Sequence, residues 1–227
     1  MNPVGTPAKQ QALSYWCKRM YAKGWVANHD GNVSLRCEDG QRFMASPTAT
    51  SKNDVEPQHI VTVDLAGKKL SGRKRLFSEW HLHAACYRAR SDAHAVIHAH
   101  PPNASAIGLA GQSLGVPAMP EVIVSLGAHI PTIARALPKS SEQDAAIQHA
   151  LTEGDAEGVL LSGNGVLCVG ADLEQAFLRL ELIEHYATIM IAAHPLGGVV
   201  SLADTDVQTL LNARTKAGLG RKGRSSS

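Results

Sequence analysis

Residues 95–102 have the sequence AVIHAHPP. The first four residues form a short apolar run with two β-branched members, which predicts a buried strand. The two prolines end this strand, because proline cannot donate to the hydrogen-bond ladder of a sheet. Side chains two apart on a strand lie on the same face, so His98 and His100 are expected to point the same way. The segment therefore predicts a buried strand that carries two neighbouring imidazoles at its end.

Two imidazoles at this spacing are suited to a shared divalent metal, because both cannot be protonated without strong repulsion. A His-x-His pair also occurs by chance or on a surface, but the buried strand and the prolines favour the metal site. The other histidines are interpreted as non-ligands. His94 is expected in the turn before the strand, His81 and His83 as packing or surface residues, and His185 as a structural residue of a long helix.

The remaining chain alternates between helical and strand-like patterns. Helices are predicted from Thr6-Pro7 to Gly24, after Ser78 as N-cap, from Asn103, from Ser140 or Ser141 towards Gly154, behind a capping box at 172–175, and over 204–213. Strands are predicted at 32–36, 42–45, 60–65, 95–98, 158–161 and 166–169. No repeat or linker interrupts this order. We therefore expect one α/β domain over residues 1–219, followed by a disordered basic tail at 220–227.

The composition excludes several classes of protein. A net charge of +2 over 227 residues argues against a dedicated nucleic-acid surface. No apolar run is long enough to cross a bilayer, and no signal peptide is evident. The four cysteines are scattered without a CxxC spacing, which predicts reduced thiols in a cytoplasmic protein. A small molecule is thus the expected partner, rather than a nucleic acid or a membrane.

Four segments, in this order, resemble the class II aldolase/adducin family. They are HDGNVS at 29–34, ASPTA at 45–49, SEWHLH at 78–83 leading into HAHPP at 98–102, and LLSGNG at 160–165. Each motif is modest alone, whereas the ordered set is specific and covers most of the chain. The resemblance implies a three-layer α/β/α fold with a central mixed, largely antiparallel sheet, and a homotetramer.

The resemblance also implies roles for three residues. His98 and His100 would be ligands of a divalent metal, zinc by type, and Glu79 would be the catalytic acid/base that can also touch the metal. A carboxylate beside a metal can shuttle the proton of an enediolate reaction. A structural alternative exists for Glu79, since negative charge is favoured in the first turn of any helix.

The chain departs from the family at the third metal ligand. The family has an Asn-His-Gly triplet where this chain has Gly163, Asn164 and Gly165. An amide oxygen is a weaker ligand than imidazole, so the affinity for zinc should fall. Asn164 is therefore expected to coordinate weakly or to hold a metal-bound water; the alternative is that no metal is retained.

A second departure concerns phosphate. By resemblance, Asn32, Thr48 and Ser78 would help to hold a substrate phosphate. Phe77 stands where the family often has a serine, and Ala49 replaces a glycine. A phenyl ring removes a hydrogen-bond donor and adds an apolar wall. We expect a substrate that lacks a phosphate or binds it differently.

The leading hypothesis is a metal-dependent aldolase-type lyase that acts on a small sugar-derived hydroxy-carbonyl compound through a metal-stabilised enediolate. A dehydratase, epimerase or decarboxylase would use the same site. A non-catalytic, adducin-like interaction module is the alternative outside enzymes; Asn164 favours it and the retained Glu79 disfavours it. Tyr21, Tyr87 and Tyr186 are candidates for protonating a leaving group, and the sequence does not choose among them.

Overall fold

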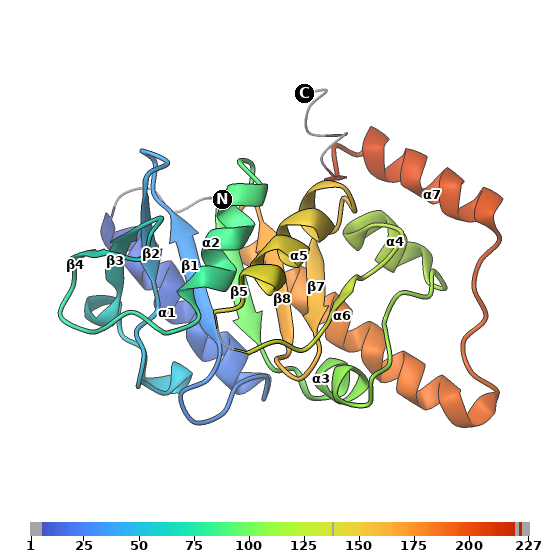
Figure 1. The fold of residues 1–227 in the computed structure, drawn as a ribbon, viewed down its shortest axis with the longest axis horizontal. Coiled ribbons are helices and arrows are strands. Elements are labelled where there is room, and N and C mark those ends of the chain that lie inside the picture. The colour runs from blue at the N-terminus through green and yellow to red at the C-terminus, as the bar shows by residue number, and fades with distance from the viewer. Residues whose placement is uncertain (1–5, 138, 221–222, 224–227) are drawn as a thin grey trace.

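One mixed sheet runs through the part of the chain that the computed structural model describes, residues 6–137, 139–220 and 223. Its strands are β1 (Asn32–Arg36), β2 (Arg42–Ala45), β3 (Val61–Asp64), β4 (Lys69–Ser71), β5 (Ala95–Ala99), β6 (Thr132–Ile133), β7 (Gly158–Leu161) and β8 (Val166–Gly170). Their order across the sheet is β4-β3-β2-β1-β5-β8-β7-β6 (Figure 1). All neighbours are antiparallel except β6 and β7, which are parallel.

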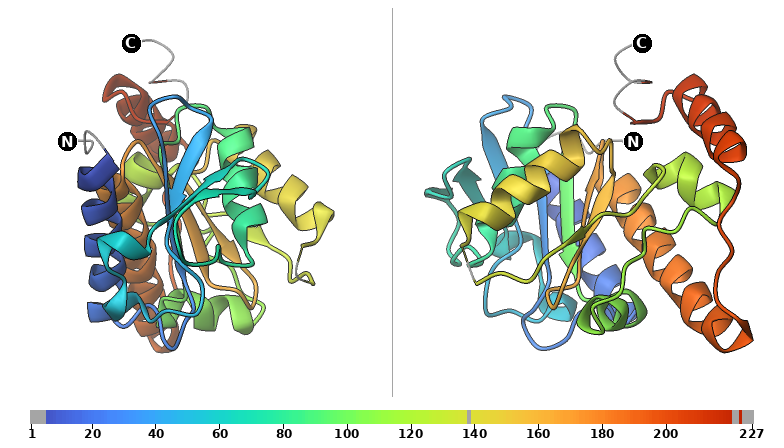
Figure 2. Two further views of the ribbon diagram at one scale, coloured as in Figure 1. Left: turned by 90° about the vertical axis from the view of Figure 1, so that its left-hand side faces the viewer. Right: turned by 45° about the vertical axis from the view of Figure 1, so that its right-hand side comes forward.

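Helices cover both faces of the sheet. They are α1 (Thr6–Ala22), α2 (Trp80–Ala89), α3 (Pro102–Leu109), α4 (Pro120–Leu126), α5 (Ser141–Thr152), α6 (Leu173–Ala193) and α7 (Asp204–Lys216), with 3-10 turns at Lys52–Asp54, Pro57–His59 and His194–Leu196. Figure 2 shows α1 and α6 on one face and α2 and α5 on the other. The predicted three-layer α/β/α fold is confirmed.

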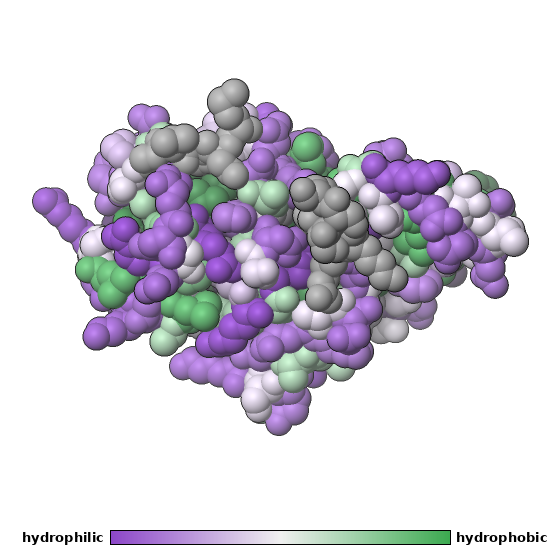
Figure 3. Space-filling view, turned by 90° about the horizontal axis from the view of Figure 1, so that it is seen from above, coloured by the Kyte–Doolittle hydropathy of each residue, from purple (hydrophilic) through white to green (hydrophobic). Residues whose placement is uncertain are grey.

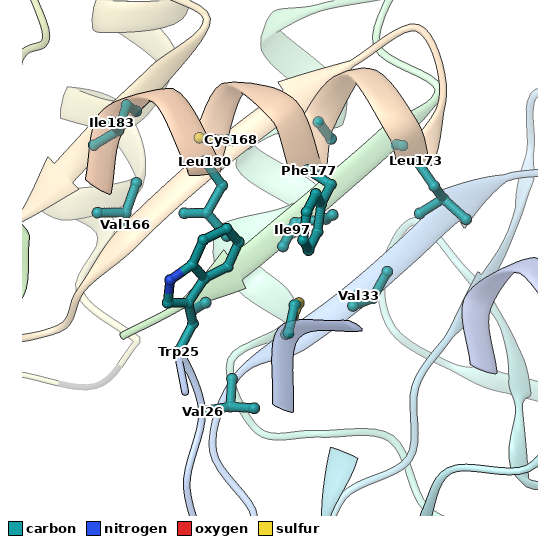
Figure 4. Packing of buried hydrophobic residues seen from close by; sticks show 14 of the residues in the cluster. Trp25, Val26, Val33, Ile97, Val166, Cys168, Leu173, Phe177, Leu180 and Ile183 are labelled. Carbon is teal, nitrogen blue, oxygen red and sulfur yellow. The ribbon is translucent and has the colours of Figure 1, made fainter. Parts of the chain in front are cut away.

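The central strand β5 is buried on both faces, as its apolar run predicts. Ile97 points into a core formed with α1 and α6, and Val96 points into a second core formed with α2 and α5. In the first core the rings of Trp25 and Phe177 lie 5.0 Å apart between their centroids (Figure 4). Burial of one such large apolar side chain stabilises the fold by about 1.5–3 kcal/mol.

Side-chain caps fix the beginnings of two predicted helices. Ser140 accepts a hydrogen bond from the backbone N–H of Gln143, and Asp172 accepts one from that of Gln175. The prediction that Ser78 caps α2 is wrong. Glu79 is the N-cap residue, and its side chain makes no capping hydrogen bond. The carboxylate therefore makes no capping hydrogen bond, although it lies at the helix N-terminus, where negative charge is favoured.

The sequence did not predict β4, β6 or α4. The exposed β4 lacks an alternating apolar pattern, β6 has two residues, and α4 has seven. Of the predicted tail, only Gly220 and Gly223 belong to the described residues; the rest lies outside them. Within the described part of the chain, no helix is long and apolar enough to cross a membrane. The face seen in Figure 3 is mostly hydrophilic, with small scattered hydrophobic patches.

Candidate functional site

Four segments that are distant in the sequence meet at the end of β5, where the strand ends at the bottom of the sheet in Figure 1. Asn32 begins β1 and pairs in register with His98 of β5. The beginning of α2 supplies Glu79, and the turn between β7 and β8 supplies Asn164, whose side chain reaches Glu79. Antiparallel pairing of β5 with both β1 and β8 brings these segments together. The structure thus assembles the predicted Glu79, His98 and Asn164 in one place.

The carboxylate of Glu79 is held by two amides. Nδ2 of Asn32 donates to Oε2 and Nδ2 of Asn164 donates to Oε1, each over 2.9 Å. Burial acts to raise the pKa of Glu79, but His98, the Asn164 amide and the charge of His100 outweigh it and hold the pKa below its ordinary value. Glu79 is therefore ionised at neutral pH, with its two oxygens fixed in position.

His98 is fully buried and its two nitrogens meet different partners. Nε2 lies 2.7 Å from the backbone oxygen of Asn164, which can only accept, so Nε2 donates. Nδ1 lies 3.4 Å from Oε2 of Glu79, an ion-pair contact whose geometry does not make a hydrogen bond. Burial lowers the pKa of His98, but the carboxylate of Glu79 more than offsets this and raises it. A proton on Nδ1 is thus stabilised by Glu79.

His100 is oriented by a residue to which the sequence assigned no role. Oδ2 of Asp30 lies 2.9 Å from Nδ1 of His100. Because a carboxylate accepts, Nδ1 carries the proton and Nε2 presents its lone pair. Asp30 lies inside the quoted motif at 29–34, two residues before Asn32, so the sequence contained the signal although the motif comparison passed over it.

Two features of the imidazoles at this site bear on whether they could hold a divalent metal. Nδ1 of His98 and Nε2 of His100 are buried without a hydrogen-bond partner among the described residues, and the two rings lie 5.2 Å apart between centroids. An unpaired buried polar atom costs about 1–3 kcal/mol, which a bound cation would offset. Three or more His, Cys, Asp or Glu in a metal-holding arrangement were not found in the described residues. The two ring nitrogens therefore fit part of a metal site, which no third His, Cys, Asp or Glu of the described residues completes in this arrangement.

The three residues expected to hold phosphate occupy different environments. Asn32 is buried and its amide is committed to Glu79, Thr48 is half-buried, and Ser78 is exposed. Phe77 does not form a wall of the site as expected, because its ring is buried against Trp80 and His83.

Gly31 allows two segments of the chain to approach each other closely. A Cβ added at Gly31, where φ is +68°, would lie 2.4 Å from Cγ1 of Val26 and 3.1 Å from the backbone oxygen of His98. Glycine at this position therefore lets the loop before β1 lie directly against the end of β5.

The other histidines are not ligands in this arrangement. His83 is fully buried with Nδ1 2.7 Å from Oγ of Ser34, and His81 contacts Asp144 over 2.8 Å. His94 precedes β5 and is exposed, as predicted. His185 is exposed on the long helix α6 and is not part of this constellation.

The three candidate tyrosines do not enter the site. Tyr87 and Tyr186 are buried, with Tyr87 bonded to Ser34 and Tyr186 to Val116. Tyr21 is exposed on α1. Of the three, none lines the cleft beside Glu79.

A cleft of about 440 Å³ opens beside this constellation. Its lining includes Ser78, Glu79, Arg135, Lys139 and Asn164. The volume suits a small organic molecule. Neither Arg135 nor Lys139 was predicted, because both lie on a loop outside the motifs that carry the family resemblance.

Comparison with known proteins gives concordant matches. The model of the Class II Aldolase and Adducin N-terminal domain matches residues 11–191. A 5-methylthioribulose-1-phosphate/5-deoxyribulose-1-phosphate aldolase of Escherichia coli is 34% identical over 70% of this chain and 72% of its own. A methylthioribulose-1-phosphate dehydratase of Granulibacter bethesdensis is 32% identical over 74% and 83%. A solved L-fuculose 1-phosphate aldolase superposes with a TM-score of 0.80 at 25% identity, over 90% of this chain and 94% of that one.

Proposed function

Because the chain belongs to the class II aldolase and adducin family, we propose that it is a metal-dependent lyase of the aldolase type. Its substrate is a small sugar-derived compound that carries a hydroxyl group beside a carbonyl. The observation that carries the proposal is the meeting of Glu79 with the buried imidazole of His98 and the half-buried imidazole of His100, beside a cleft; each ring has one buried nitrogen that makes no hydrogen bond within the described residues. An interaction module would gain nothing from unpartnered buried nitrogens, since each one destabilises the fold.

In this proposal His98 and His100 hold a divalent cation, zinc by type, with Glu79 beside them and Asn164 as a weak ligand. When bound, the cation supplies Lewis-acid stabilisation of the enediolate. Glu79 is ionised and held by two amides, so it accepts the proton that the substrate hydroxyl loses as the carbon–carbon bond breaks. Asp30 keeps His100 in the tautomer that leaves Nε2 free.

The test is retro-aldol turnover with a panel of ketoses and ketose phosphates. We expect Glu79→Gln to lower kcat about 10²–10⁴-fold, because the base is lost while the shape is kept. The matched control is Glu153→Gln, which makes the same change of atoms at an exposed carboxylate outside the cleft and should leave turnover unchanged. Wild-type turnover that survives Glu79→Gln unchanged would contradict the proposal, as would metal-free wild-type protein that still turns over.

Dehydration is a second candidate, favoured by the 32% identity to the methylthioribulose-1-phosphate dehydratase. The two reactions share an enediolate and differ in how it arises: in the aldolase reaction it is released as the carbon–carbon bond breaks, whereas in dehydration it forms by loss of a C–H proton and then expels a hydroxyl group as water. Product analysis by NMR separates them: cleavage yields two smaller carbonyl compounds, whereas dehydration retains the carbon skeleton. Epimerisation and decarboxylation give equally distinct products.

The proposal includes a cytoplasmic homotetramer. All four cysteines are buried free thiols, as expected for a reducing compartment. The tetramer follows from the family resemblance, and light scattering on the purified protein tests it.

A further inference from the structure

The parallel pairing of β6 with β7 places the positively charged Arg135 beside the candidate site. Ile133 pairs in register with Leu161, and the N–H of Ser162 donates to the oxygen of Ile133 over 2.9 Å. Two residues further along each segment come Arg135 and Gly163, so the arginine arrives beside the turn that precedes β8.

Gly163 makes room for this guanidinium. A Cβ added there, at a φ of +76°, would lie 2.8 Å from Nε and 3.0 Å from Nη2 of Arg135. Any other residue would push Arg135 off the turn that carries Asn164. The triplet that lacks the third imidazole is thus also the one that accommodates an arginine.

Two positively charged side chains line the cleft, and neither has an anionic partner among the described residues. Arg135 and Lys139 both line it, and neither makes an ion pair or a side-chain hydrogen bond with any residue in the described ranges. Glu79 is the one carboxylate in the lining, and its oxygens are already bonded to Asn32 and Asn164. The two positive charges are therefore available to a ligand.

We propose that Arg135 and Lys139 bind an anionic group of the substrate, a carboxylate or a phosphate, in the cleft that contains Glu79. A guanidinium donates two parallel hydrogen bonds to either group, and an ammonium adds a point charge. The amide of Asn32 is committed to Glu79, so it is a poor donor for such an anion. This inference rests on the proposed function, because it names the substrate class of the same site: an anionic hydroxy-carbonyl compound.

The test is isothermal titration of the full chain with three matched four-carbon probes: erythritol, D-erythronate and D-erythritol 4-phosphate. Arg135→Gln should weaken binding of the preferred anion about tenfold or more, and Lys139→Gln should weaken it less. The control Lys74→Gln removes an exposed lysine that does not line the cleft and should change nothing. Raising the salt concentration should weaken binding by the wild type more than binding by Arg135→Gln, in which Lys139 is the remaining positive charge of the pair.

The outcomes are distinct. Tighter erythronate identifies a carboxylate and tighter erythritol phosphate identifies a phosphate, and either supports the subsite if the preference depends on Arg135. Absence of binding by both anions, or equal binding to wild type and Arg135→Gln, overturns it. A chain that binds an anion through Arg135 but shows no Glu79-dependent turnover keeps the subsite and loses the proposed function. Glu79-dependent turnover that Arg135→Gln leaves unchanged keeps the proposed function and loses the subsite.

Discussion

Glu157 and Glu79 are both withdrawn from solvent, but their partners differ in kind. The side chain of Glu157 is 0% exposed and contacts three arginines: Arg90 over 3.2 Å, Arg179 over 3.0 Å and Arg214 over 2.9 Å. Glu79 is 30% exposed and is held by two neutral amides and one imidazole. The first carboxylate faces permanent charges; the second faces groups that are neutral or can lose a proton.

The Glu157 cluster, formed by Glu157 with Arg90, Arg179 and Arg214, has a structural role. Its arginines come from the end of α2, from α6 and from α7, so one carboxylate ties three helices to the strand β7 that follows it. Asp92 and Asp155 add contacts to Arg90 and Arg214. Three positive and three negative charges therefore balance in and around a buried volume.

The Glu79 cluster has no such balance. Nε2 of His100 has no hydrogen-bond partner among the described residues, Nδ1 of His98 has only its ion-pair contact with Glu79, and the adjoining cleft is lined by two positively charged side chains. Buried groups of a folded protein are normally satisfied, so a local excess of unsatisfied groups indicates a site that is completed by something outside the chain. Charge burial alone does not distinguish the two carboxylates, whereas the completeness of their partners does.

The largest effect on stability is expected from a substitution in the Glu157 cluster. Glu157→Gln leaves three buried guanidiniums facing two peripheral carboxylates, and we expect the free energy of unfolding to fall by about 3–5 kcal/mol. Urea unfolding followed by circular dichroism measures it. The control Glu153→Gln, exposed at the end of α5, should stay within about 0.5 kcal/mol of wild type. A loss below about 1 kcal/mol at Glu157 would show that the charges are not coupled as described.

A smaller effect is expected where Asp30 orients His100. Asp30→Ala removes the acceptor that fixes the ring, so zinc affinity should fall about 10–100-fold. Competition with a chromophoric chelator measures the affinity, and Asp206→Ala on the exposed face of α7 is the control. Unchanged affinity in Asp30→Ala would mean that the contact is incidental. Failure of the wild type to bind zinc would instead remove the zinc from the proposed function.

The sequence predicts the sheet core because the pattern of β5 is local. Ala95 to Ala99 alternates between two apolar layers, and the prolines after it mark its end. The resemblance to the class II aldolase/adducin family, carried by the ordered motifs, then implies that Glu79, His98 and Asn164 share one site. The strand follows from local periodicity, whereas the shared site follows from the resemblance.

The rest depends on contacts between distant segments. Arg135 enters the cleft only through the parallel pairing of β6, a two-residue strand with no pattern of its own. Ser78 looks like a helix cap, but tertiary contacts begin the helix one residue later and turn Glu79 towards Asn32 and Asn164. Tertiary packing overrides local preference at these positions.

The smallest effect concerns pH and separates the two clusters by their chemistry. The arginines around Glu157 carry permanent charges, whereas an imidazole can gain a proton in mild acid. His83, one turn after Glu79 on α2, behaves differently, because burial, aided by the charge of His98, lowers its pKa well below the ordinary value. As the pH falls below about 6.5, the unfolded chain binds a proton at this position that the folded chain does not, so stability is lost on acidification.

His83→Gln keeps a hydrogen-bonding group near Ser34 but cannot titrate. Between about pH 6.5 and pH 5.5 the wild type should therefore lose about 1 kcal/mol more of its free energy of unfolding than this variant. Urea unfolding at both pH values measures the difference, in which any constant cost of the substitution cancels. His185→Gln, exposed on α6, is the matched control and should follow the wild type. If His83→Gln loses as much stability as the wild type over this pH range, the loss of stability in acid arises at groups other than His83.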